Sequence, residues 1–68
     1  MDIQKFTEHL YDYEIEHLSQ TDYRSAEYRM ENGTSLDEVI KLLRNWAYDY
    51  RIEAEAFNVE TSWFHRNQ

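Results

Sequence analysis

The chain has no cysteine, no proline and only one glycine among its 68 residues. Without cysteine no disulfide can stabilise the fold, and this usage fits a reducing compartment. With one glycine there is no glycine-rich phosphate loop and no Gly-x-Ser-x-Gly nucleophile elbow, so we expect no enzyme. The near absence of helix breakers favours helices separated by few turns.

Basic residues are also scarce. Fourteen Asp and Glu against seven Lys and Arg give a formal net charge of −7. Binding to DNA, RNA or an anionic membrane requires a basic surface, so we expect none of these partners. The charge instead favours a basic protein surface as the partner, by electrostatic attraction.

Long apolar segments are missing as well. No apolar run approaches the ~20 residues that span a bilayer, and no basic segment followed by an apolar one marks a signal peptide. We therefore expect a cytoplasmic protein made of one small acidic domain, residues 1–68. Two Trp, six Tyr and three Phe argue against a disordered acidic tail.

What the sequence does contain is helical periodicity. The clearest helix is predicted over 36–58, where Ser35 and Glu38 form a capping box and Gly33 suits the end of a preceding helix. Its apolar residues follow heptad spacing. They are Leu36, Ile40, Leu43, Ala47, Tyr50, Ala54 and Phe57, widened by Val39 and Trp46. The last ten residues, 59–68, are left either as a flexible end or as an extension of this helix.

Two shorter helices are predicted before it, over 3–18 and 21–32. A single straight helix from Ile3 to Met30 would direct its two apolar stripes about 150° apart, which one core cannot accommodate. A break near Ser19 to Thr21 removes this conflict, and Ser19 and Thr21 are both candidate N-caps of the second helix. The fold class is therefore an all-α bundle of about three helices.

The long helix carries a second apolar stripe, formed by Tyr48, Ile52, Ala56 and Val59. This stripe lies roughly opposite the heptad stripe at 100° per residue. A helix that is apolar on two sides needs neighbours on both, and a chain this short has a marginal core. We therefore expect a homodimer. The residues assigned to its interface or to the core are Leu36, Ile40, Leu43, Trp46, Tyr50 and Phe57.

Acidic side chains are concentrated at the start of the chain. On the helix predicted over 3–18, Glu8, Asp12 and Glu16 form one outward row opposite the apolar stripe, with ~6 Å of rise between neighbours. Such a row is either an ordinary solvated face or an imitation of a nucleic-acid backbone that occupies a basic groove. With Glu27, these carboxylates are candidate contacts to a partner.

Glu14 and His17 form a Glu-x-x-His pair on the inner side of the same segment. Di-metal helical bundles use this pair twice, together with two further glutamates. A homodimer would supply the second copy, which makes a metal-binding dimer an alternative function. The simpler interpretation is that His17 suits the negative end of the helix dipole in the last turn, and that Glu14 and His17 either pair with each other or meet arginine residues at a rim. We expect no metal and no cofactor.

Several aromatic residues exceed what one small core can bury. Tyr11, Tyr48 and Trp63 are candidate interface residues, because Tyr and Trp are enriched at protein interfaces. A structural or adaptor dimer that acts through such aromatics is a further alternative.

In size, charge and helicity the chain resembles the small acidic inhibitors that phages and mobile elements direct against restriction enzymes, CRISPR effectors or repressors. Immunity proteins, antitoxins and regulatory adaptors share these features. The resemblance involves no sequence motif, so it assigns no site residues. It implies a non-enzymatic protein that inhibits or regulates a basic, nucleic-acid-binding target, in the manner of an anti-restriction or anti-CRISPR protein or another DNA or RNA mimic.

Overall fold

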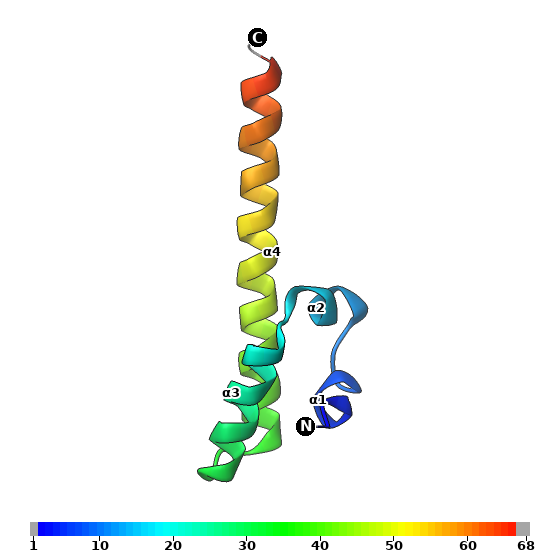
Figure 1. Ribbon diagram of the computed structural model, residues 1–68, viewed down its shortest axis with the longest axis vertical. Coiled ribbons are helices and arrows are strands. Elements are labelled where there is room, and N and C mark those ends of the chain that lie inside the picture. Colours follow the sequence, from blue (N-terminus) through cyan, green and yellow to red (C-terminus); the bar gives the residue numbers. More distant parts are fainter. Residues whose placement is uncertain (1, 67–68) are drawn as a thin grey trace.

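The computed structural model describes the backbone of residues 2–66 and the side chains of residues 2–55. Over this range the protein is all-α, as the sequence predicts. It contains α1 (Gln4–Thr7), α2 (Asp12–His17), α3 (Gln20–Glu31) and α4 (Leu36–Arg66) (Figure 1). Four helices replace the expected three, because the segment 3–18 forms two short helices instead of one.

The break between α1 and α2 arises from local hydrogen bonding. After α1 the N–H groups of His9 and Leu10 bond to carbonyl groups only three residues earlier, which tightens the chain and ends the helix. Tyr11 is then extended, with φ −79° and ψ 158°. Its N–H donates to Oε1 of Glu14 at 2.7 Å. The carboxylate of Glu14 thus satisfies a free N–H at the start of a new helix.

The predicted break near Ser19 is confirmed. Ser19 is the N-cap of α3: its Oγ accepts the N–H of Asp22 at 3.4 Å, and its own N–H donates to Oδ2 of Asp22 at 2.9 Å. This reciprocal pair is a capping box, which was not predicted at this position.

The turn between α3 and α4 contains the predicted glycine and N-cap, but only one of the two hydrogen bonds of the predicted capping box forms among the described residues. Gly33 has φ +103°, a backbone conformation that a side chain disfavours. The N–H of Thr34 reaches back to the carbonyl of Arg29 at 2.9 Å and satisfies the end of α3. Oγ of Ser35 accepts the N–H of Glu38 at 3.3 Å and so caps α4.

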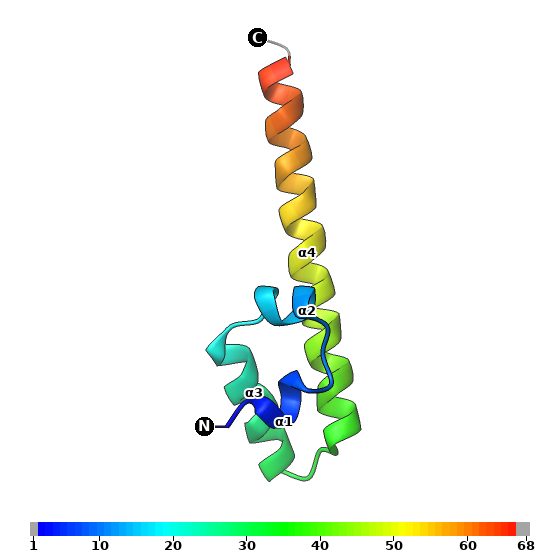
Figure 2. The ribbon, with the colours of Figure 1, turned by 90° about the vertical axis from the view of Figure 1, so that its right-hand side faces the viewer.

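The core lies where α1, α2 and α3 cover the first part of α4 (Figure 2). The rings of Phe6 and Tyr23 stack with centroids 6.1 Å apart. The buried apolar residues are Phe6, Leu18, Tyr23, Ala26, Val39, Leu43 and Ala47. Leu36, Ile40 and Trp46 are only partly buried and pack against this cluster, together with Ile3, Leu10 and Met30.

Beyond Ala47 the helix leaves the core. Every side chain from Tyr48 to Glu55 is exposed, and α4 continues past the predicted end at Asn58 to Arg66. The molecule is accordingly elongated, with dimensions of 53 × 19 × 18 Å (Figure 1). We call residues 2–47 the head and residues 48–66 the arm. No helix within the described range is long and apolar enough to cross a membrane.

Candidate interaction surface

Glu14 is the one charged residue among the buried side chains of residues 2–55, with an exposed fraction of 3%. Its Oε2 accepts a hydrogen bond from Nε of Arg44 at 3.0 Å, and its Oε1 accepts the N–H of Tyr11. The bond to the carboxylate, together with its charge, raises the pKa of Arg44 above its already high value. Glu14 therefore both starts α2 and attaches α2 to α4.

Two stacked tyrosines strengthen the same contact. The rings of Tyr11 and Tyr13 lie nearly parallel, with centroids 6.1 Å apart. Arg44 lies 5.0 Å from the centroid of Tyr11, and Arg51 lies 5.0 Å from the centroid of Tyr13. Tyr11, a candidate partner contact, is still 61% exposed. Arg44 and Arg51 thus each cover one ring, a cation–π arrangement that holds α2 against α4.

This arrangement bears on the metal alternative. The prediction that Glu14 faces the core is confirmed by its burial, but both of its oxygens already accept hydrogen bonds. His17 is partly buried at the end of α2. No group of three or more metal-ligating side chains occurs among the described residues. A metal ion at Glu14 would have to displace Arg44.

The expected acidic row along one helix is wrong in its geometry. Glu8 lies at the end of α1, whereas Asp12 and Glu16 belong to α2, and an extended residue separates the two helices. All three side chains are exposed, but only Asp12 and Glu16 share one helix face, four residues apart. We call these two residues the carboxylate pair.

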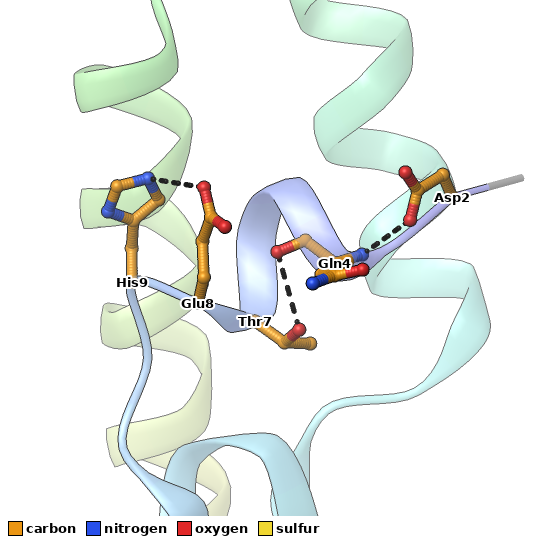
Figure 3. A network of polar contacts seen from close by, with 5 residues as sticks. All are labelled: Asp2, Gln4, Thr7, Glu8 and His9. Carbon is orange, nitrogen blue, oxygen red and sulfur yellow. Dashed lines mark hydrogen bonds and ion pairs between the residues drawn. The ribbon is translucent and has the colours of Figure 1, made fainter.

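Two of the candidate acidic contacts have neighbours within the head. Oε1 of Glu8 lies 3.5 Å from Nε2 of His9 (Figure 3). Oε2 of Glu27 lies 3.2 Å from Nζ of Lys5, an ion pair that joins α3 to α1. Glu27 therefore contributes to holding α1 in place, which makes it a weaker candidate for partner binding.

Many exposed carboxylates remain uncompensated. Within residues 2–55 the ion pairs with Lys or Arg engage only Glu14, Glu27 and Glu55. The exposed acidic residues without an ion pair in this range are Asp2, Asp12, Glu16, Glu31, Asp37, Glu38, Asp49 and Glu53. The excess negative charge of the sequence is thus presented on the surface of the head and the base of the arm.

Tyr50 marks the point where the head meets the arm. Its hydroxyl donates to Oδ1 of Asp22 at 3.1 Å, linking α4 to the start of α3. That hydrogen bond and the charges of Asp22, Glu53 and Asp49 raise the pKa of Tyr50. Tyr50 was assigned to the core or dimer interface, yet it is 39% exposed in the single chain.

The remaining aromatic candidates divide into two groups. Tyr48 is 57% exposed at the base of the arm, near Ile52, which is 44% exposed. Phe57 and Trp63, the other assigned residues of this helix, lie outside the described side chains.

The contacts of Tyr13, Arg44 and Arg51 between α2 and α4 were not predicted from the sequence. Arg44 and Arg51 are seven residues apart on one face of α4, and Tyr11 and Tyr13 flank the start of α2. The heptad spacing of the arginines was a usable signal. Pairing them with the tyrosines required knowing that the chain turns between α1 and α2.

Comparison with known proteins found no family model, no curated protein and no solved structure that matches this chain. Function must therefore be argued from the surface itself.

Proposed function

We propose that this protein is a non-enzymatic binding protein that occupies a basic surface of a nucleic-acid-binding protein and thereby inhibits or regulates it. The observation that carries this proposal is the exposed carboxylates without a cationic partner. Asp12 and Glu16 on α2 are the two exposed carboxylates that most resemble adjacent phosphates of a nucleic-acid backbone. A basic groove that normally binds nucleic acid would supply these two carboxylates with cationic partners.

The local arrangement supports contact at α2. The bond between Glu14 and Arg44 fixes this short helix on α4, so the carboxylate pair is displayed on an anchored element. Tyr11, at the start of the same helix, presents an exposed ring beside the pair. An exposed aromatic next to uncompensated acids is suited to binding a surface that combines arginine with apolar groups.

The test compares immobilised wild-type protein with the double variant Asp12→Lys/Glu16→Lys. The matched control, Glu31→Lys/Asp37→Lys, makes the same charge change at the turn between α3 and α4. Lysate of the source cells is applied at low salt and the bound proteins are eluted with a salt gradient. We expect wild type and control to retain the same basic protein, released as salt screens the contact, and the α2 variant to lose it.

Retention of that protein by the α2 variant at unchanged salt would contradict binding through α2. Circular dichroism of each variant establishes that the helices are intact. If the captured protein binds DNA or RNA, added nucleic acid should release it from the immobilised protein, because both ligands would occupy one groove. Nucleic acids that bind the captured protein more tightly should release it at lower concentrations.

We further infer that the protein acts as a homodimer, since α4 continues beyond its own core with apolar side chains exposed. Tyr50 is 39% exposed and lies on the same face of α4 as the buried Leu43 and Ala47. Tyr48 and Ile52 are 57% and 44% exposed on the opposite side of the arm. This second apolar face favours a second candidate function, an adaptor dimer whose partner contacts Tyr48. In that case substitution of Tyr48 would weaken partner binding more than substitution of the carboxylate pair.

A further inference from the structure

One apolar face of α4 runs continuously from the head into the arm. Leu43 and Ala47 are fully buried by the helices of the head. Ala54 lies eleven residues after Leu43 and therefore at an angle of about 20° from it around the helix. In the single chain Ala54 is exposed, and Tyr50, on the same face, is 39% exposed. We call this face of the arm the seam.

A bare seam is physically unfavourable for a helix of this kind. The arm comprises residues 48–66, and every described side chain on it is exposed. Helices of roughly 12–15 residues or fewer are marginal in water without packing, and longer ones gain most of their stability from a packed apolar face. The arm therefore needs a neighbour that buries its seam, as α2 and α3 bury the apolar face of the first part of α4.

We propose that this neighbour is the arm of a second copy of the chain, packed seam to seam and running in the opposite direction. This inference rests on the homodimer proposed above, but not on the binding of a basic partner. The heptad spacing that buries Leu43 and Ala47 inside one chain would then be used again, between chains, at Tyr50 and Ala54.

The position of the head decides the direction. The buried residues of α4 show that α1, α2 and α3 cover the seam face at the foot of this helix (Figures 1 and 2). Two arms in parallel would bring both heads to the same level, where each would occupy the space between the two helices. Antiparallel arms place the heads at opposite ends, so each arm ends near its partner's head.

Charge favours the same arrangement. Residues 2–47 contain ten acidic and five basic residues, a net charge of −5, whereas residues 48–66 contain four acidic and two basic residues, a net charge of −2. Two heads of like charge repel each other, and this repulsion decreases with separation and with screening. Antiparallel pairing places the two heads at opposite ends of the dimer, whereas parallel pairing would bring these like charges side by side.

The first test separates the seam from the opposite apolar face. Ala54→Glu introduces a charge on the seam, and Ile52→Glu introduces the same charge about 180° from Leu43, on the other side of the arm. Neither residue belongs to the core of the head. Sedimentation equilibrium should show a dimer for wild type and for Ile52→Glu, and a monomer for Ala54→Glu.

The second test measures direction. Because the chain has no cysteine, single spin labels can be attached at Lys41→Cys or at Asp49→Cys, both exposed positions of α4. In an antiparallel dimer the distance between equivalent labels shortens by about 3 Å for each residue toward the carboxyl end, twice the helical rise. The two sites should thus differ by about 24 Å. In a parallel dimer they would be nearly equal.

The outcomes are distinct. A wild-type monomer at about 100 μM, a concentration well above that of micromolar association, would overturn both the dimer and the seam pairing. A dimer disrupted by Ile52→Glu and not by Ala54→Glu would overturn the choice of face, and equal label distances would overturn the direction. The variant Asp12→Lys/Glu16→Lys should remain a dimer, so loss of partner binding and loss of dimerisation can be told apart.

Discussion

Arg44 donates a hydrogen bond from Nε to Oε2 of Glu14 across 3.0 Å, and this bond joins residues thirty positions apart in the sequence. It is the only hydrogen bond between the side chains of α2 and α4 within residues 2–55. The acceptor is 4% exposed and the donor 43% exposed, so the pair lies at the edge of the core. The carboxylate charge of Glu14 is therefore compensated within the head and is not available to a partner.

The first prediction concerns this pair. Glu14→Ala leaves the N–H of Tyr11 and the guanidinium of Arg44 without their acceptor, so we expect the free energy of unfolding to fall by about 2 kcal/mol. Glu16→Ala, an exposed acid of the same helix, should change it by less than about 0.5 kcal/mol. Urea denaturation followed by circular dichroism measures both. Equal losses in the two variants would contradict the anchoring role.

The second prediction concerns Tyr23, whose ring is buried against Phe6. Its hydroxyl has no hydrogen-bond partner among the residues that the structure describes, and a buried polar group without a partner is costly. Tyr23→Phe removes the hydroxyl and keeps the stack, so the free energy of unfolding should rise by about 1 kcal/mol. Tyr28→Phe, at a residue that is 67% exposed, should leave it unchanged. A loss of stability in Tyr23→Phe would show that the hydroxyl is bound in solution.

The third prediction is a loss of stability at alkaline pH. Burial raises the pKa of Tyr23, with a smaller contribution from Asp22, and the bond to Asp22 raises the pKa of Tyr50. The folded state thus favours neutral tyrosine. This contribution is complete below the ordinary value of 10.0 and is lost as pH rises through the raised folded-state pKa.

Thermal unfolding of wild type should therefore show Tm falling steeply above about pH 10. The double variant Tyr23→Phe/Tyr50→Phe should show a shallower fall over the same range, because two of the groups that ionise are gone. A double variant at the exposed residues Tyr28 and Tyr48 provides the control. If that control flattened the curve equally, the effect would come from net charge and not from these two sites.

Sequence periodicity was sufficient for most of the fold. The heptad stripe located α4 and its buried Leu43, and the break expected near Ser19 located the start of α3. Ser19 and Gly33 marked helix ends because their preferences are local: one caps with a hydroxyl, and the other adopts a positive φ. Such signals are contained in a few neighbouring residues, which is why they can be recognised in one sequence.

The break before Tyr11 was not recognisable in this way. It depends on Glu14, whose carboxylate is held by Arg44 from a distant part of the chain, and tertiary contacts of this kind override local helical pattern. The row of Glu8, Asp12 and Glu16 was wrong for the same reason. Whether the carboxylate pair binds a partner is a question that helical spacing alone cannot decide, because spacing places side chains without identifying what they contact.

The fourth prediction concerns the turn before α4. Gly33 has φ +103°, and although a Cβ there would meet no atom within 4 Å, the backbone conformation itself disfavours one. Gly33→Ala should therefore lower the free energy of unfolding by about 1 kcal/mol. Arg24→Ala, at an exposed position within α3, is the control and should have little effect. An unchanged Gly33→Ala variant would indicate that the turn adopts another conformation in solution.

The fifth prediction concerns the arm. Every buried residue of the described chain lies at or before Ala47, so a chain that ends at Glu55 should keep a folded head. If arms pair, folding of the full chain is coupled to association, and its Tm should rise with protein concentration. The Tm of the shortened chain should be independent of concentration, because most of its arm is missing. Differential scanning calorimetry over a hundredfold range of concentration measures both.

Two results would contradict this prediction. A shortened chain that unfolds would show that the arm stabilises the head directly. A full chain whose Tm does not change with concentration would show that the arms do not pair.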